Sequence, residues 1–299
     1  MTREASGPTL DAMRRAAGID VGGTTIKGLR LDASGRRFPG PVPVPTPTDE
    51  AALVDAVAAL ARELGEPRVG VCVAGIVDET RGVALSGSNL PWRDSPLRER
   101  LSDAIGAPVA LGHDVRCGAR AEARWGGHGG VRFLYVNLGT GVSAVTVTDG
   151  EPASGPWHGE IGQPLVPDPA DPTSLVSIER LASAEAVTRR YADRSGGLPS
   201  AGADVVFGRL AQGDPVAAAV VNEAVSALAQ CLAFTVAATA PEVIVLAGGM
   251  AQAGSALVEP LSGRLESLLG ILPRPRLVVS RLGPDAEAMG AAALALSAD

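Results

Sequence analysis

Short apolar runs alternate along the chain with longer stretches in which apolar residues recur at helical spacing. An apolar run bounded by glycine or proline predicts a buried strand, and helical spacing over ten or more residues predicts a helix. The predicted strands lie at 18–21, 26–31, 42–44, 68–74, 109–111, 242–250 and 277–280. The predicted helices lie at 51–64, 96–105 and 285–297 and, with glycine interruptions, over 178–240. Strands that alternate with helices predict an α/β protein.

The pattern of the first strands recurs in the middle of the chain. Residues 133–150 again read as strand, glycine-threonine turn and strand, so the sequence contains a weak internal repeat. We therefore expect two lobes. The expected division is an N-terminal arm over 1–14, a smaller lobe over 15–112 and a larger lobe over 113–284, with a closing helix over 285–299 that packs back on the smaller lobe.

Composition and charge exclude several classes of function. The 299 residues are 46% hydrophobic and 20% charged, which is typical of a soluble globular protein. A net charge of −7 argues against a nucleic acid or an anionic membrane as partner. Residues 216–240 contain Asn222, Glu223 and Gln230 and are predicted to form a buried helix. Three isolated cysteines indicate a reducing cytoplasm, with no disulfide frame.

Three glycine turns follow predicted strands and carry the candidate chemistry. They are Gly22-Gly23-Thr24, Gly139-Thr140-Gly141 and Gly248-Gly249. One such turn is typical of an ordinary hairpin, but successive N–H groups and threonine hydroxyls also suit phosphate oxygens. Asp20 ends the strand before the first turn, where a buried carboxylate is costly unless a cation meets it. The chain contains neither a GxxxxGK[ST] loop nor a GxGxxG fingerprint.

From about residue 17 to its C-terminus the chain resembles the ROK family of sugar kinases, in the sugar kinase/Hsp70/actin superfamily. GIDVGGTTIKG resembles the first phosphate motif of the family, LGTGVS its second and VLAGGM its adenosine motif. GHDVRCGARAEARWG matches the stretch with the catalytic aspartate, HGEIGQ the sugar-contacting GEIGH, and SIERLAS the end of the zinc loop. The resemblance implies a two-lobed actin-like ATPase (ribonuclease H-like) fold with an interlobe active-site cleft, and a homodimer.

The resemblance implies ATP and Mg²⁺ as cofactors. Asp114 is then the general base, although an aspartate there also suits a helix N-cap. Asp20 is expected to hold Mg²⁺, through water, or else to pin the turn by hydrogen bonds, and the role of Lys27 is open between charge and plain solvation. Threonines 24 and 140 are expected to contact phosphates. The full set of expected cofactor-binding residues is Asp20, Gly22, Gly23, Thr24, Thr25, Lys27, Gly139, Thr140, Gly141, Gly248 and Gly249.

The resemblance also implies a set of sugar-binding residues. They are Asn89, Leu90, His113, Asp114, Glu160, Gln163 and Glu179. A turn asparagine is the alternative for Asn89, and a surface glutamate is the alternative for each of the two glutamates. Trp92 and Trp157 are expected to pack in the protein and not to stack on sugar.

The chain departs from the family pattern at the zinc loop and at two sugar-contacting positions. Gln163 stands where the family has a histidine ligand, and Ser177 stands where its last zinc-binding cysteine falls, so we expect no zinc. His113 replaces the asparagine before the catalytic aspartate and, near its ordinary pKa of about 6.5, is expected to be able to become cationic. Both changes touch hydroxyl recognition, so an amino-hexose such as kanosamine or a cyclitol joins glucose as candidate acceptor.

The function expected from these residues is ATP-dependent phosphorylation of a C6-type hydroxyl on a hexose-like acceptor. The alternatives are a transcriptional repressor of the same family and a catalytically impaired sugar-binding regulator. Fewer than twenty residues precede the first strand, and the charge is acidic, which disfavours a DNA-binding repressor. Retention of Asp20 and Asp114 disfavours an impaired enzyme. ATP and polyphosphate both remain open as donors.

Overall fold

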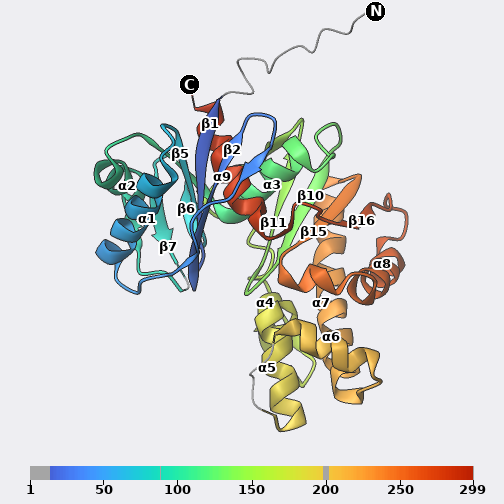
Figure 1. The fold of residues 1–299 in the computed structure, drawn as a ribbon. Coiled ribbons are helices and arrows are strands. Elements are labelled where there is room, and N and C mark those ends of the chain that lie inside the picture. Colours follow the sequence, from blue (N-terminus) through green and yellow to red (C-terminus); the bar gives the residue numbers. More distant parts are fainter. Residues whose placement is uncertain (1–13, 88, 198–201, 299) are drawn as a thin grey trace, which may run out of the picture. The chain divides into compact units, whose positions relative to one another are not determined.

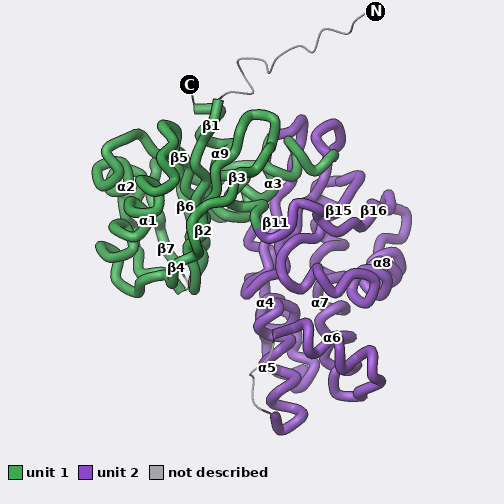
Figure 2. The backbone as a smooth tube through the Cα atoms, in the orientation of Figure 1, with its two compact units in different colours: residues 1–127, 151–158, 285–299 green, residues 128–150, 159–284 purple. Residues whose placement is uncertain are grey.

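The computed structural model describes residues 14–87, 89–197 and 202–298, coloured along the chain in Figure 1. Except for Arg14, the arm expected over residues 1–14 lies outside them. The chain divides into two compact units, distinguished by colour in Figure 2. The first unit comprises residues 1–127, 151–158 and 285–299, and the second comprises 128–150 and 159–284. The first unit thus extends past the boundary expected at residue 112, because the helix that follows packs along the C-terminal helix.

The first unit is built on a mixed sheet in the strand order β3-β2-β1-β5-β9, with β4 paired to β2. The strands of the unit, which are not all part of this sheet, are β1 (Arg15–Val21), β2 (Thr25–Asp32), β3 (Arg37–Phe38), β4 (Val44–Pro45), β5 (Val69–Val73), β6 (Ile76–Asp78), β7 (Val83–Ser86), β8 (Arg93–Ser95), β9 (Val109–His113) and β12 (Glu151–Pro152). Its helices are α1 (Glu50–Leu64), α2 (Leu97–Ile105), α3 (Asp114–Trp125) and α9 (Ala286–Ser297), preceded by the 3-10 turn η3 (Gly283–Asp285). Strand β1 pairs antiparallel with β2 and parallel with β5.

Small residues on one face of this sheet allow the backbone of α9 to approach closely. Gly18 and Gly70 lie side by side in the register of β1 and β5. A Cβ atom on Gly18 would lie 1.9 Å from the carbonyl oxygen of Ala288, and one on Gly70 would lie 1.8 Å from that of Ala291. Only glycine leaves room for such contacts. Helix α9 is therefore held against the strands that carry the first glycine turn.

The second unit repeats the strand arrangement of the first. Strand β10 pairs antiparallel with β11 and parallel with β15, which pairs parallel with β16. Its strands are β10 (Phe133–Leu138), β11 (Val142–Thr148), β13 (Leu165–Asp168), β14 (Asp171–Ser177), β15 (Val243–Ala247) and β16 (Arg276–Val279). Its helices are α4 (Ile178–Ala182), α5 (Ala184–Ser195), α6 (Ala203–Ala211), α7 (Pro215–Thr239), α8 (Ser255–Leu269) and the 3-10 turn η2 (Gly249–Ala253).

Helix α7 runs through the core of the second unit. By length and composition alone it could cross a membrane. Its buried residues, from Ala217 to Val236, belong to the main hydrophobic cluster of the unit, as expected for the core helix of a globular protein. Asp214 caps its first turn by accepting the N–H groups of Val216 and Ala217 at 2.8 and 3.1 Å.

Three features of the fold differ from the sequence pattern. The sheet β6-β7-β8 and the hairpin β13-β14 were not predicted, because their strands are short or carry exposed polar residues. The edge strand expected at 42–44 is shifted, since β4 pairs with β2 only at Val44 and Pro45.

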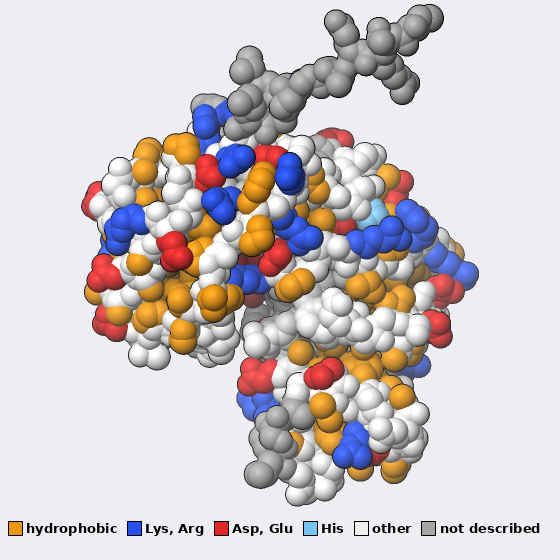
Figure 3. All heavy atoms as spheres, viewed as in Figure 1, with side chains coloured by type: hydrophobic (Ala, Val, Ile, Leu, Met, Phe, Trp, Pro, Cys, Tyr) orange, Lys and Arg blue, Asp and Glu red, His pale blue; other side chains and the backbone are white. Residues whose placement is uncertain are grey.

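On the face of the molecule in Figure 3, acidic and basic side chains are interspersed among scattered hydrophobic ones.

The contact between α9 and α3 predicts a large stability difference between two glycine substitutions. A Cβ atom at Gly290 would lie 1.7 Å from the carbonyl oxygen of Cys117, whereas one at Gly263, an exposed position of α8, would have no atom within 4 Å. We expect Gly290→Ala to lower the free energy of unfolding by about 3 kcal/mol. Gly263→Ala should raise it by about 0.5–1 kcal/mol. Urea denaturation measures both, and equal midpoints for the two variants would contradict the packing described.

Candidate active site

A buried ion pair lies at the end of β1. Asp20 is 9% exposed and stands opposite Lys27 in the β1–β2 register, with 3.2 Å between Oδ2 and Nζ. Burial raises the pKa of the Asp20 carboxyl, and Lys27 opposes that rise. Burial would lower the pKa of Lys27, but the carboxylates of Asp20 and Glu287 outweigh it and raise that pKa. The cation that a buried Asp20 requires is therefore Lys27, which has a charge role and is not merely solvated.

The first glycine turn is closed by backbone and threonine contacts. The N–H of Gly22 donates to the carbonyl of Thr25 at 3.0 Å, and Oγ1 of Thr46 donates to the carbonyl of Gly22 at 2.7 Å. Thr24 and Thr25 are exposed. A Cβ atom on Gly23 would lie 3.0 Å from the Cβ of Asn89. The structure thus brings the expected phosphate turn and the expected sugar-binding Asn89 together.

Other residues expected near the sugar have different environments. Leu90 is buried in the hydrophobic core of the first unit together with Trp92, which is 1% exposed. Trp157 is 68% exposed, so the expectation that both tryptophans pack in the protein is wrong for this one. Nothing in the local sequence distinguishes the two, because each follows a proline or glycine-rich turn.

Asp114 is the first residue of α3, directly after β9. Its Oδ1 accepts the N–H of Val115 at 2.7 Å, and its side chain is 20% exposed. The N-cap position itself belongs to His113, whose side chain makes no capping bond. An ionised carboxylate at this end of α3 is favoured by the helix dipole. The structure thus places a partly exposed carboxylate where a strand meets a helix.

His113 is neutral, contrary to the expectation that it can become cationic. Its side chain is 5% exposed, and burial together with the positive charge of Arg116 lowers its pKa to about 3. Its Nδ1 lies 3.3 Å from Oδ1 of Asp114. The motif predicts an ordinary pKa because the effect of Arg116 on this ring depends on the fold, although an arginine inside an apolar helical pattern was a usable signal. His113 therefore neighbours the candidate base as a neutral ring.

Glu179 braces the glycine turn of the second unit. Its Oε2 accepts the N–H of Val142 at 2.9 Å, and a Cβ atom on Gly141 would lie 2.6 Å from that oxygen. Its Oε1 accepts a hydrogen bond from Nε2 of Gln163 at 3.3 Å. Glu160 lies in the same turn as Gln163, and its carbonyl accepts the backbone N–H of Gln163 at 3.1 Å. The structure thus joins three residues expected to bind sugar to the expected phosphate turn.

The third glycine turn follows β15. Gly248 has a φ of +85°, and a Cβ atom there would lie 2.6 Å from the carbonyl oxygen of Leu138, so glycine is required. At Gly249 an added Cβ would meet open space. The buried Oδ1 of Asn137 makes no hydrogen bond to any described residue. An open glycine turn beside an orphaned acceptor fits a nucleotide, which brings hydrogen-bond donors.

Asn137 was not predicted as a site residue, although a polar residue inside the run FLYVNL was a usable signal.

The segment expected to replace the zinc loop forms β13-β14, and Asp171 there accepts hydrogen bonds from Thr173 and Ser174, both at 2.6 Å. In the part of the chain that the structure describes, no group of three or more His, Cys, Asp or Glu residues is placed to hold a metal ion. A single carboxylate such as Asp20 still fits Mg²⁺ held through water, since Mg²⁺ keeps several of its waters.

Two α/β units of like topology, with glycine turns after their strands, define a sugar kinase of the actin-like ATPase fold. The ROK family profile matches residues 16–298, and the chain belongs to the ROK family. The expected fold class and enzyme class are thereby confirmed.

Two relatives that match nearly the whole chain are named as sugar kinases. The glucokinase of Streptomyces coelicolor is 28% identical over 94% of this chain and 98% of its own length. The N-acetyl-D-glucosamine kinase of Salmonella paratyphi B is 30% identical over 94% and 99%. The crystal structure of a ROK glucokinase from Streptomyces griseus, in complex with glucose and AMPPNP, has a TM-score of 0.83 at 26% identity, over 94% of this chain and 99% of that one.

A transcriptional regulator of the same family shares the fold as well. Described as a homologue of the E. coli MLC protein, it has a TM-score of 0.81 at 21% identity, over 96% of this chain and 80% of its own. At that identity the likeness concerns the fold alone.

The contacts of Glu179 predict a nucleotide effect of its substitution. In Glu179→Ala the N–H of Val142 loses its acceptor, so the turn at 139–141 loosens and KM for ATP should rise roughly tenfold. Glu179→Gln keeps an acceptor oxygen and should stay within about threefold of the wild type. Steady-state kinetics with each substrate varied in turn separate the two effects. A rise confined to the sugar KM would instead assign Glu179 to sugar hydroxyls.

Proposed function

We propose that the protein transfers the γ-phosphoryl group of ATP to the C6-type hydroxyl of a hexose or hexose-like sugar, with Asp114 as general base. The observation that carries the proposal is the Asp114 carboxylate, ionisable, partly exposed and fixed at the first position of α3. Full-length similarity to glucokinases and to an N-acetylglucosamine kinase supports the substrate class. A base that aligns and deprotonates an acceptor hydroxyl is one of the parts that phosphoryl transfer requires.

The nucleotide and its metal are assigned to the glycine turns and to Asp20. The N–H groups of turns 22–25 and 139–141, with the exposed hydroxyls of Thr24 and Thr140, are proposed to bind phosphate oxygens. Turn 248–249, open at Gly249, is proposed to bind the adenosine part. Asp20 would hold Mg²⁺ through water, and the ion would neutralise charge on the phosphates. Lys27 favours the ionised form of Asp20 and holds its carboxylate in place.

The acceptor is proposed to be selected by Asn89, Glu160 and Gln163, with His113 acting through its neighbour Asp114. His113 and Gln163 are the positions that depart from the family pattern, so an amino-hexose such as kanosamine or a cyclitol is a candidate beside glucose and its N-acetylated amine. A neutral His113 does not repel an ammonium group on the sugar. A homodimer, a cytoplasmic location and the absence of zinc remain predictions from the sequence.

Asp114→Asn tests the proposed base. The amide keeps the shape of the side chain but cannot take the proton, so kcat should fall about 10²–10⁴-fold while KM for ATP changes little. Coupled ADP release measures turnover, and Asp103→Asn, at an exposed position of α2, is the matched control. The assignment fails if Asp114→Asn keeps more than about a tenth of the wild-type kcat.

A further inference from the structure

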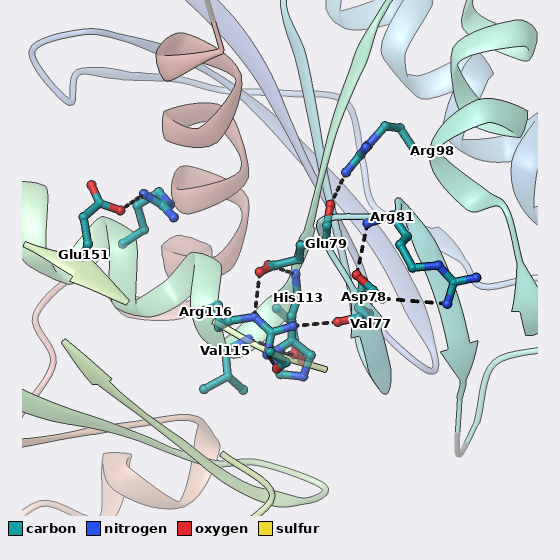
Figure 4. A network of polar contacts seen from close by, with 12 residues as sticks. Val77, Asp78, Glu79, Arg81, Arg98, His113, Val115, Arg116 and Glu151 are labelled. Carbon is teal, nitrogen blue, oxygen red and sulfur yellow. Dashed lines mark hydrogen bonds and ion pairs between the residues drawn. The ribbon is translucent and has the colours of Figure 1, made fainter. Parts of the chain in front are cut away.

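A buried arginine lies two residues after Asp114. Arg116 is 3% exposed, and each of its three guanidinium nitrogens donates a hydrogen bond, as Figure 4 shows for those to Glu79 and Val77. Its Nε donates to Oε2 of Glu79 at 2.9 Å, its Nη2 to the carbonyl of Val77 at 2.9 Å, and its Nη1 to the carbonyl of Gly155 at 3.1 Å. A charge held this far from water is costly unless every donor is satisfied. Arg116 therefore holds Glu79 and the two carbonyl groups in one arrangement.

Glu79 connects Arg116 to His113, the residue directly before Asp114. While Oε2 of Glu79 accepts from Arg116, its Oε1 accepts the backbone N–H of His113 at 2.7 Å. His113 ends β9, and Asp114 begins α3 directly after it. The ion pair of Glu79 with Arg116 thus fixes the backbone at the junction from which Asp114 projects.

The ring of His113 presents an unprotonated nitrogen to Asp114. A hydrogen bond to the backbone of Gly75 favours protonation of the ring, so the carbonyl of Gly75 accepts from an imidazole N–H. Nδ1 is buried and makes no hydrogen bond to a described residue, which assigns that N–H to Nε2. Because burial and Arg116 lower the pKa of His113 to about 3, Nδ1 is a lone-pair acceptor near neutral pH. It lies 3.3 Å from Oδ1 of Asp114.

We propose that Arg116 is a positioning residue that, with Glu79, keeps the neutral Nδ1 of His113 beside Asp114 to accept a hydrogen bond from the carboxyl group formed during the reaction. The inference rests on the proposed role of Asp114 as base. As the acceptor oxygen bonds to the γ-phosphorus and ADP leaves, the hydroxyl proton moves to the Asp114 carboxylate. The new carboxyl O–H then donates to Nδ1, and no proton is transferred to the ring. A protonated ring would offer Asp114 a donor instead and would oppose this step.

The groups that face His113 decide the direction of a pH effect. They are the Arg116 guanidinium, the Asp114 carboxylate and the carbonyl of Gly75 at the ring, and the Glu79 carboxylate at the backbone N–H. Arg116 disfavours a cationic ring, and the two carboxylates favour one. Burial is the larger cause of the low pKa of His113 and persists in Arg116→Met, but the ring there loses the opposing charge, so its pKa should rise.

The experiment compares five variants by kcat, by KM for both substrates and by melting temperature, with ATP and the sugar that turns over fastest. His113→Phe keeps a ring without an acceptor and should lower kcat roughly tenfold with KM for ATP unchanged. His113→Asn restores an acceptor oxygen and should recover part of that loss. Arg116→Met should lose activity at a higher pH than the wild type when the assay is acidified, and Arg116→Met combined with His113→Phe should not show this shift.

Arg120→Met is the matched control. Arg120 lies on the same helix, and its Nη1 donates to Oε2 of Glu151 at 2.7 Å instead of contacting His113 or Glu79. It should keep wild-type kcat and pH profile. The inference is overturned if His113→Phe keeps kcat within about twofold of the wild type, or if Arg120→Met loses as much as Arg116→Met. If Arg116→Met does not fold, the two His113 variants decide. Activity in Asp114→Asn would overturn the proposed function itself, whereas an inactive Asp114→Asn beside a fully active His113→Phe would overturn this inference alone.

Discussion

The packing of α9 on β1, β5 and α3 is the constraint on which the first unit depends. Glycines 18, 70 and 290 allow backbone contacts that any side chain would block. The same face of the sheet carries Asp20 and Cys72. Helix α9 contacts this face through Glu287, whose carbonyl accepts a hydrogen bond from the thiol of Cys72. Burial, reinforced by the charge of Asp20, raises the pKa of Glu287 to about 7. The C-terminal helix therefore sets the surroundings of a carboxylate that lies far from it in the sequence.

Two buried charges, one near the end of β1 and one in the first turn of α3, are the second recurring feature. Asp20 is matched by Lys27, the only lysine in the chain, and Arg116 is matched by Glu79 and two carbonyl groups. Desolvation makes each charge costly alone, so both pairs hold their partners in one arrangement. The first pair orders the residue assigned to Mg²⁺, and the second orders the backbone beside the proposed base. The proposed function and the stability of this unit thus rest on the same contacts.

Much of the fold followed from the sequence because the buried strands and long helices have clear periodicity. The internal repeat predicted from 133–150 is seen in the matched pairing of β1 and β10 with their neighbours. The short strands β6 to β8 were missed, since three or four residues carry no measurable alternation. An aspartate directly before a proline is typical of a helix N-cap, and Asp214 caps α7 in this way.

The candidate site was predictable where chemistry follows chain order and unpredictable where it depends on contacts across the fold. Glycine turns and Asp114 were visible as motifs. The neutrality of His113 depends on burial and on Arg116, and the bracing role of Glu179 depends on Val142, which lies 37 positions away. Neither contact can be derived from spacing. Both change the interpretation of a residue that the motif alone assigns to the sugar.

The central claim is that the protein phosphorylates a sugar and does not merely bind one. The most direct measurement is ³¹P NMR of a reaction with ATP and a panel of glucose, mannose, N-acetylglucosamine, their free amino-sugars and cyclitols. The account predicts a new phosphate monoester on the primary hydroxyl of at least one hexose-type sugar, formed in equal amount with ADP. Saturable sugar binding without any ester, in the presence of ATP and Mg²⁺, would contradict it and would favour a sugar-responsive regulator.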